Sequence, residues 1–338
     1  MHFGDLSTIR MQNSIKNMRY AENSAYDRYE FVIPVSQLFH IRMAHLRQIF
    51  NIHWGSESKD DPGTLHEIKN ILRRKRINAN ASEIYECERL LEIVIESNVL
   101  GMALAAQHVE SIEALGDKLV NWNVLESLVT SIADKIDNQY LRLSRRYPKA
   151  ERDMVFENSC LLVNDGISHL EYLRALREGD IGAILKVLDI WTVGFHASSA
   201  TGQYAQELLS LALRLKHQWS TGLKNMLTDH WIVNPSGRPK KWQEADVVQE
   251  SHNRIEKAIY GGKTYPKLSF LSEVVSANIP MLREHANQIE RFYSTWTSVS
   301  HTEKDQSVDI QTLLQHFLHE RVHILTNGRE SDFEPLHT

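Results

Sequence analysis

The stretch from residue 84 to residue 98 has the sequence IYECERLLEIVIESN. Within it, Ile84, Cys87, Leu91, Val94 and Asn98 follow one another at steps of three or four residues. On a helix of about 3.6 residues per turn, this spacing puts the side chains on one stripe. The stretch is therefore predicted to be an amphipathic helix that buries this stripe in a core, with Cys87 as an inert thiol.

The same period recurs along most of the chain. Further stripes are formed by Phe39, Met43, Leu46 and Phe50; by Ile181, Ile184, Leu188, Trp191 and Phe195; by Tyr204, Leu208, Leu211 and Leu215; and by Leu268, Leu271, Val275, Ile279 and Leu282. Breakers are few, since the 338 residues include only 15 glycines and 8 prolines. A mainly α fold, a multi-helix array, is therefore predicted. Its expected core includes Phe39, Leu46, Leu91, Val94, Leu188, Trp191, Leu208, Leu211 and Leu271.

One short piece near the N-terminus is typical of a strand. Phe31, Val32 and Ile33 are apolar and partly β-branched, and Pro34 closes them. We expect at most one or two such strands, all near the N-terminus. Loops divide the chain into predicted parts: an N-terminal helix–strand–helix segment 1–60, an insertion-like helical region 61–178, a C-terminal helical region 179–325 and a flexible tail 326–338.

Composition excludes several classes of protein. Hydrophobic residues make up 42% and charged residues 24%, which is usual for globular domains. A net charge of −5 gives no global basic field toward nucleic acid or anionic membranes. The two cysteines are too few for a disulfide framework, and no signal peptide is visible. The most apolar run, Val99 to Ala106, is too short to span a bilayer. We expect an intracellular protein, nuclear or cytoplasmic, without a membrane partner.

Residues 319–323 match the zinc motif H-E-x-x-H, on a helix expected over 309–325. In that motif His319 and His323 would bind zinc from one helix face, and Glu320 would activate a metal-bound water. A catalytic zinc needs a third protein ligand, but Arg329 stands where the extended motif has its third histidine. The motif face also lies opposite the apolar stripe and is expected to be solvated. We expect a chance match with adventitious metal binding, and keep a zinc hydrolase as the last alternative.

Two basic stretches are candidates for contact with a phosphate backbone. One is the run Arg73, Arg74, Lys75 and Arg76, and the other is the pair Lys240 and Lys241. The run is also what the basic, solvated end of a short helix looks like, and it can serve as a nuclear signal. The pair precedes Trp242, which could stack on a base, but a plain helix–helix connection has the same turn residues.

An ordered set of short motifs runs through the chain. In order, they are Gly4–Thr8, Tyr26–Val35, Leu38–Met43, His53–Gly55, Gly179–Gly182, Tyr204–Leu209 and Val233–Gly237, followed by Asp246, Glu250 and Asn253. This order resembles a fungal domain-of-unknown-function family (DUF6589-like), abundant in mushroom-forming basidiomycete fungi and scattered in mobile-element-like loci. The resemblance spans most of the chain, from Gly4 to Arg329.

The layout of that family looks like a transposase of the RNase-H-like type. Such enzymes hold two divalent metals, such as magnesium, between acids on strand ends and on a helix. The resemblance places Asp5 at a strand end and Glu207 on the helix beyond the insertion. The upstream strand with an aspartate–asparagine pair is missing here, so the site is short of one acid.

We therefore expect a truncated, non-catalytic, transposase-like protein that needs no cofactor and binds nucleic acid weakly. Its N-terminal strands would be the remnant of an RNase-H-like α/β sheet, and a missing N-terminal segment or a partner chain would complete it. The alternative is a helical scaffold or protein-interaction module without any inherited active site. The two differ in whether Asp5 and Glu207 converge, and in whether an apolar patch is exposed.

Overall fold

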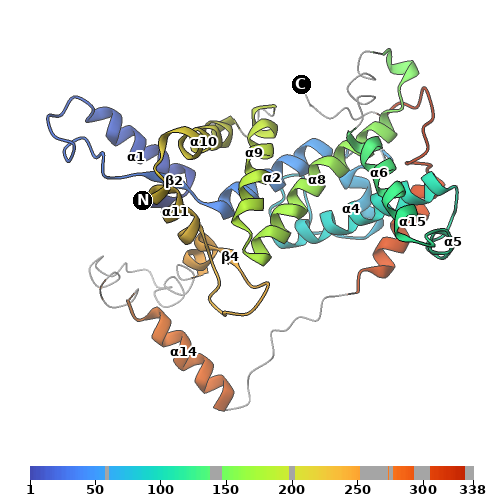
Figure 1. Cartoon of the computed structure of the whole chain (residues 1–338). Coiled ribbons are helices and arrows are strands. Elements are labelled where there is room, and N and C mark those ends of the chain that lie inside the picture. The colour runs from blue at the N-terminus through green and yellow to red at the C-terminus, as the bar shows by residue number, and fades with distance from the viewer. Residues whose placement is uncertain are drawn as a thin grey trace. The chain divides into compact units, whose positions relative to one another are not determined.

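Helices dominate the chain in the computed structural model, which describes residues 1–57, 61–137, 147–197, 202–251, 273, 277–292 and 305–331 (Figure 1). The prediction of a mainly α fold is confirmed. The chain divides into two compact units, each discontinuous in sequence. Unit 1 comprises Met1–Phe39 and Thr221–Asp305, and unit 2 comprises His40–Ser220 and Gln306–Thr338. The four consecutive parts expected from the sequence stay a prediction.

Unit 1 contains two small sheets. Strands β1 (His2–Gly4) and β2 (Pro34–Ser36) are parallel, with Gly4 opposite Ser36. Strands β3 (Ile232–Val233) and β4 (Gln243–Glu244) are antiparallel. The strand expected at Phe31–Ile33 is therefore displaced: Phe31 lies in a turn, and the strand begins at Pro34. The second sheet, far from the N-terminus, was not predicted either; its strands are too short to carry a pattern.

Residues 245–251 of unit 1 are helical, and three longer helices also belong to this unit. They are α1 (Leu6–Met18), α11 (Thr221–Trp231) and α14 (Ala277–Phe292). Trp231 ends α11 and is fully buried, and its Nε1–H donates to the carbonyl oxygen of Ser36 over 3.2 Å. This bond fixes α11 to the end of β2, because a buried indole needs a partner for its N–H.

Unit 2 is a helical array. Its elements are α2 (Leu38–His53, from His40 onward), α3 (Leu65–Ile71), α4 (Ile84–Gln107), α5 (Ile112–Lys118), α6 (Trp122–Asp137), η1 (Lys149–Glu151), α8 (Met154–Glu178), α9 (Ile181–Ala197), α10 (Gly202–Leu213) with its π-helical extension η3 (Arg214–Gln218), and α15 (Ser307–His319). Helix α4 packs on α5, α6, α8 and α15, so a segment from the end of the chain covers the central helix (Figure 1). Helices α8, α9 and α10 pack in sequence.

The central helix α4 contains residues 84–98, and the predicted stripe is buried at Cys87, Leu91 and Val94. The helix is longer and more apolar than the run expected from the sequence. Among the residues described, it is the one helix that could cross a membrane by length and composition, with a mean hydropathy of 1.4. Of the 18-residue window with this hydropathy, 61% is buried, and a core helix of a globular unit meets the same criterion. Its packing on four helices favours this second interpretation.

Most of the predicted core is buried in unit 2. Leu46, Leu91, Val94, Leu188, Trp191, Leu208 and Leu211 are all buried. Phe39 is only half-buried, and Leu271 lies outside the described residues, as does most of its stripe. The spacing of apolar residues thus identifies the buried faces of these helices, because the side chains on a buried face recur about every 3.6 residues.

Helix α15 ends earlier than the 309–325 expected from the sequence. Arg321 adopts a left-handed conformation with φ 53°, and the N–H of Val322 donates to the carbonyl of Phe317. This bond pattern is a Schellman motif, which terminates a helix. Glycine usually supplies the left-handed residue, so an arginine there gives no sequence signal of a helix end.

Candidate functional site

The carboxylate of Asp5 lies at the carboxyl end of β1 and caps α1. Its Oδ1 accepts the backbone N–H of Thr8 over 2.8 Å. In the same unit, Oδ1 of the buried Asp246 accepts the N–H of Phe39, which follows β2, over 3.3 Å. Because β1 and β2 are parallel, their carboxyl ends share one edge of the sheet. Asp5 and Asp246 therefore both lie in unit 1 near that edge.

The second predicted acid, Glu207, belongs to unit 2. It lies on α10 and is half-buried. The acid that lies in the same unit as Asp5 and bonds to the segment after β2 is Asp246, which the sequence had marked only as part of a motif. The signal that could have found it is its place after the Asn234–Pro239 turn, but only tertiary structure shows which strand that turn approaches.

The two histidines of the H-E-x-x-H match do not share a helix face. His319 is the last residue of α15 and its side chain is 84% exposed, whereas His323 follows the helix and is only 7% exposed. The expectation that this whole face is solvated is wrong for His323, because Arg321 turns the chain before it. Within the described part of the chain, no group of three or more side chains could hold a metal ion.

The ring of His323 is part of the helix packing. Asn98 donates its amide to the carbonyl of Val94 over 2.8 Å, so its Oδ1 is left to accept Nε2–H of His323 over 2.9 Å. Burial, and then the charges of Arg329 and Lys135, lower the pKa of His323 to about 3. The imidazole is therefore neutral, with its proton on Nε2 and a lone pair on Nδ1.

A second buried polar cluster joins four helices of unit 2. Nε2 of His169 on α8 lies 3.3 Å from Oε1 of Glu88 on α4, so it must donate. Nδ1 of His169 then accepts Nδ1–H of His45 on α2 over 3.1 Å. Trp191 on α9 stacks on His45, and burial above all lowers the pKa of both histidines. These neutral rings connect the packed helices. Neither His45 nor His169 lines the two surface hollows formed by α4 with α15 and by α6.

The thiols offer no reactive group. Burial, the largest cause in each case, raises the pKa of Cys87 and of Cys160 to about 12. A thiolate is the reactive form, so both are inert at neutral pH.

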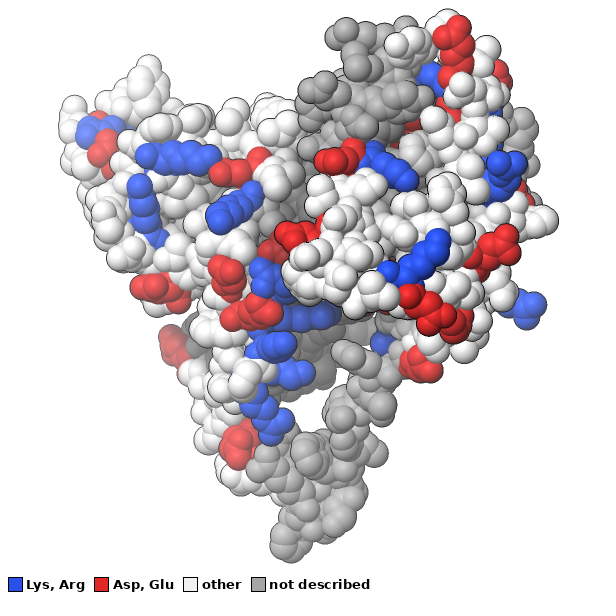
Figure 2. All heavy atoms as spheres, turned by 45° about the vertical axis from the view of Figure 1, so that its right-hand side comes forward, with Lys and Arg blue, Asp and Glu red and all other residues white. Residues whose placement is uncertain are grey.

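The predicted basic residues are mostly exposed. Arg73, Lys75 and Arg76 lie in the turn after α3, while Arg74 pairs with Asp309 at the start of α15. Lys240 and Lys241 are exposed in unit 1. The two stretches belong to different units. Figure 2 shows Lys and Arg interspersed with Asp and Glu over much of the visible face.

An open groove lies between the ends of α4 and α15 and is called here the α4–α15 groove. Its volume is about 780 Å³. Its apolar wall is formed by Leu104, Val109, Phe317, Leu318, Ile324 and Leu325. Ile324 and Leu325 remain 40% and 48% exposed, so the apolar surface continues onto the lip. The volume falls within the range of ligand sites, about 300–1,000 Å³.

Polar side chains surround this wall. They are His108, Glu110, Lys135, Gln315 and Arg321. All are exposed except Lys135, which is half-buried. His108 and Arg321 are the left-handed residues that end α4 and α15, at φ 51° and 53°. Such strain in non-glycine residues costs about 1–2 kcal/mol each and is concentrated at functional sites.

The lip of the groove is held from behind by Arg329. This guanidinium donates to the carbonyls of Glu320 and Arg321, each over 3.0 Å. It also forms a two-pronged ion pair with the fully buried Asp153, with both bonds at 2.8 Å. Asp153 in turn caps α8 and accepts the N–H of Thr326. The loop at residues 320–326 is therefore fixed before any ligand arrives.

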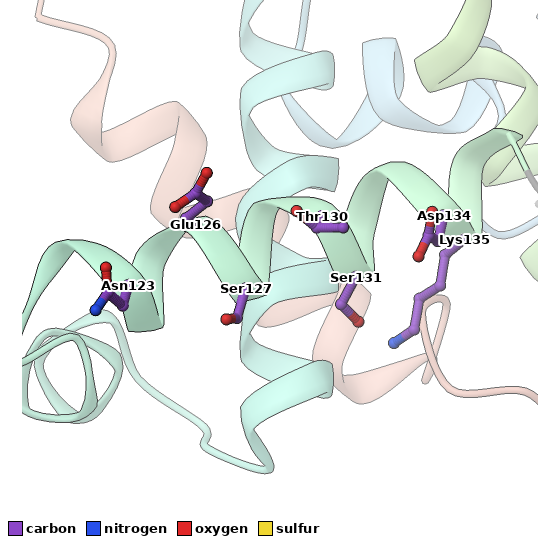
Figure 3. Close-up of a pocket in the computed structure, with 7 residues that line it drawn as sticks. All are labelled: Asn123, Glu126, Ser127, Thr130, Ser131, Asp134 and Lys135. Atoms are coloured by element: carbon purple, nitrogen blue, oxygen red, sulfur yellow. The ribbon is translucent and has the colours of Figure 1, made fainter.

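A second hollow, on the outer face of α6, is a weaker candidate. All seven labelled side chains project from this one helix, from Asn123 to Lys135 (Figure 3). Six of them are exposed, and the lining is hydroxyl, amide and charged groups. A site usually needs groups that converge from several elements, so this hollow is the ordinary polar face of a helix.

Fold and sites together define a mainly α protein in which the described residues assemble no metal centre and leave one apolar groove open between two helix ends. Residues 1–301 match a family described as a family of unknown function (DUF6589), and the chain belongs to that family. The match ends before α15, which forms one side of the groove. No curated protein and no solved structure matches the chain.

Proposed function

We propose that this chain is a non-catalytic helical module that binds an apolar segment of a partner protein in the α4–α15 groove. The observation that carries the proposal is the groove itself, with an apolar wall, a rigid lip and two exposed apolar side chains, Ile324 and Leu325. A groove open along one side suits a peptide helix that lays down an apolar face. This is the protein-interaction alternative that the sequence left open.

Several contacts support a non-catalytic function. Asp5 and Asp246 each accept a backbone N–H, so part of their capacity serves to hold the local fold. His319 and His323 are separated by the end of α15, so we do not propose a zinc hydrolase. Both buried thiols are inert, and they fit an intracellular location, nuclear or cytoplasmic.

We also propose that the N-terminal sheet descends from an RNase-H-like transposase of a mobile element. The parallel pair β1–β2, with Asp5 and Asp246 at its carboxyl edge, supports this origin. Ligands of parallel sheets bind at that edge. A divalent metal such as magnesium would have these two acids as its ligands. Titration of the chain with Mn²⁺, followed by the paramagnetic relaxation of water, tests this proposal. Binding that is lost in Asp246→Asn would support it, and equal relaxation in both chains would contradict it.

Binding in the groove is tested with a neutral amphipathic peptide of about 15 residues, the length at which an isolated helix becomes stable. It carries Leu at i, i+3, i+4 and i+7 and Gln elsewhere. Wild-type chain is expected to bind the labelled peptide, with an affinity at least about tenfold above that of Ile324→Asp or Leu325→Asp. Val193→Asp is the matched control, since Val193 is an exposed apolar residue on α9. Absence of binding, or equal loss in Val193→Asp, would refute the proposal.

Weak nucleic-acid binding is the second candidate, favoured by the exposure of Arg73, Lys75 and Arg76 in one turn. Phosphate contacts make binding depend on salt, with a slope that counts the contacts. Replacement of all three by Gln is expected to flatten the salt slope for labelled single-stranded DNA by about two to three contacts. Lys240→Gln with Lys241→Gln reports on the other stretch. An unchanged slope in both variants would exclude these residues as the interface.

A further inference from the structure

The rim of the α4–α15 groove carries unbalanced positive charge. Lys135 projects from the last turn of α6, and Arg321 from the turn after α15. Glu110 is the one acid among the lining residues that the structure describes. Within the described residues, neither Lys135 nor Arg321 forms an ion pair. By contrast, Arg329 behind the lip is fully paired with Asp153.

The positive field reaches the floor of the groove. After burial, the causes that lower the pKa of His323 are the charges of Arg329 and Lys135. The ring therefore stays neutral and leaves the charge of Lys135 unbalanced. An apolar wall beside two cations is complementary to a ligand that is apolar on one side and anionic on the other.

The backbone presents Arg321 in a fixed position. Its left-handed conformation ends α15, and the N–H of Arg321 donates to the carbonyl of Leu318. Arg329 holds the carbonyl of Arg321 from the other side. A charge on a preorganised turn loses little backbone freedom when it pairs with a ligand, so its pairing contributes more to affinity.

We propose that the partner segment is an acidic amphipathic helix, whose apolar anchors fill the α4–α15 groove while its carboxylates pair with Lys135 and Arg321. This rests on the proposed function of the groove. A nucleic acid strand would offer charge without apolar anchors and would leave the wall formed by Leu104 and Phe317 unfilled. An acidic amphipathic helix would contact both the apolar wall and the two cations.

Three labelled peptides test this partner. Each is about 15 residues long with the same leucine spacing, and the polar positions carry Glu, Gln or Lys. In fluorescence anisotropy, the Glu peptide is expected to bind about tenfold tighter than the Gln peptide, and the Lys peptide weakest. Raising the salt from about 0.05 to 0.5 M should remove most of the Glu advantage, because exposed charges are screened.

Charge variants then locate the effect. Lys135→Gln combined with Arg321→Asn is expected to reduce the Glu advantage to less than about threefold and to leave the Gln peptide unchanged. Asn is chosen at position 321 because it tolerates the left-handed conformation. Lys186→Gln with Arg177→Gln is the control, since it removes two exposed charges from other helices.

The outcomes separate the two proposals. Equal binding of the Glu and Gln peptides would overturn the acidic partner and keep the groove. An equal effect of the control pair would also overturn it, because the attraction would then come from the whole surface. If no peptide binds, the groove function fails and the acidic partner with it. The salt dependence of wild-type chain decides the question even if the charge variants fail to fold.

Discussion

Arg329 and Asp153 form a two-pronged ion pair in which both bonds measure 2.8 Å and the aspartate is fully buried. The pair joins the cap of α8 to the loop that ends α15, across 176 residues of sequence. In the sequence, Arg329 stands only where an extended zinc motif would have its third histidine. In the structure it is the residue that fixes the lip of the groove.

Removal of one partner of this pair should therefore cost more stability than removal of one partner of an exposed ion pair. Arg329→Gln is expected to lower the free energy of unfolding by about 3 kcal/mol, because the buried carboxylate of Asp153 loses its counter-charge. Lys216→Gln breaks the exposed pair with Asp189 and should cost less than about 1 kcal/mol. Urea denaturation of both variants measures the difference. Similar small costs would mean that Arg329 does not anchor the loop.

A methyl group at Gly101 should disturb the floor of the groove. A Cβ there would lie 2.4 Å from Nδ1 of His323, closer than any real contact. Gly101→Ala is expected to cost about 1–3 kcal/mol of stability and to weaken binding of the neutral peptide. Gly116→Ala on α5 meets no atom within 4 Å and should be neutral or stabilising by up to about 1 kcal/mol. Thermal denaturation compares them, and a tolerated Gly101→Ala would contradict the packing of His323.

Buried His323 should make the fold sensitive to acid. Its folded pKa, about 3, lies below the ordinary value of 6.5, so the unfolded chain binds the extra proton between these values. The contribution of the neutral ring is present above pH 6.5 and is lost as the pH falls, at up to about 1.4 kcal/mol per pH unit. His323→Gln keeps a donor for Asn98 and should flatten the stability profile between about pH 6.5 and 5. The exposed His319→Gln should not, and equal profiles would refute the assignment.

His316 should act in the opposite direction. Its Nε2 lies 3.0 Å from Oε1 of Glu67 on α3, and the interaction with this carboxylate is the main cause that raises its pKa above 6.5. The stabilisation is present in full below pH 6.5 and disappears as the pH rises through the raised value. The cost of His316→Gln should therefore be larger at about pH 6 than at pH 9. Denaturant midpoints at both values check the sign, and a cost that grows with pH would contradict it.

Helices were predictable from the sequence because the apolar side chains on their buried faces recur at helical spacing. Leu91 and Val94 are buried at the positions that the period assigns them. The end of α15 was not predictable from the sequence, since Arg321 adopts the left-handed conformation that glycine usually supplies at a helix end. That single residue separates His319 from His323 and turns an apparent zinc motif into an exposed side chain and a packed one.

The groove could not be read from the sequence, because its wall comes from residues 101–110 and 315–325, which are distant along the chain. The same holds for Asp246, which approaches β2 only through tertiary packing. Short strands such as β3 and β4 leave no pattern of their own. Local periodicity therefore gave the elements, whereas both candidate sites depend on long-range contacts.

The most direct test of the α4–α15 groove as a binding site is hydrogen–deuterium exchange of the full chain with and without the neutral leucine peptide. The predicted result is slower exchange confined to residues 101–110 and 315–325, with residues 181–197 of α9 unchanged. Slowing elsewhere, or no slowing at the ends of α4 and α15 under saturating peptide, would contradict the account.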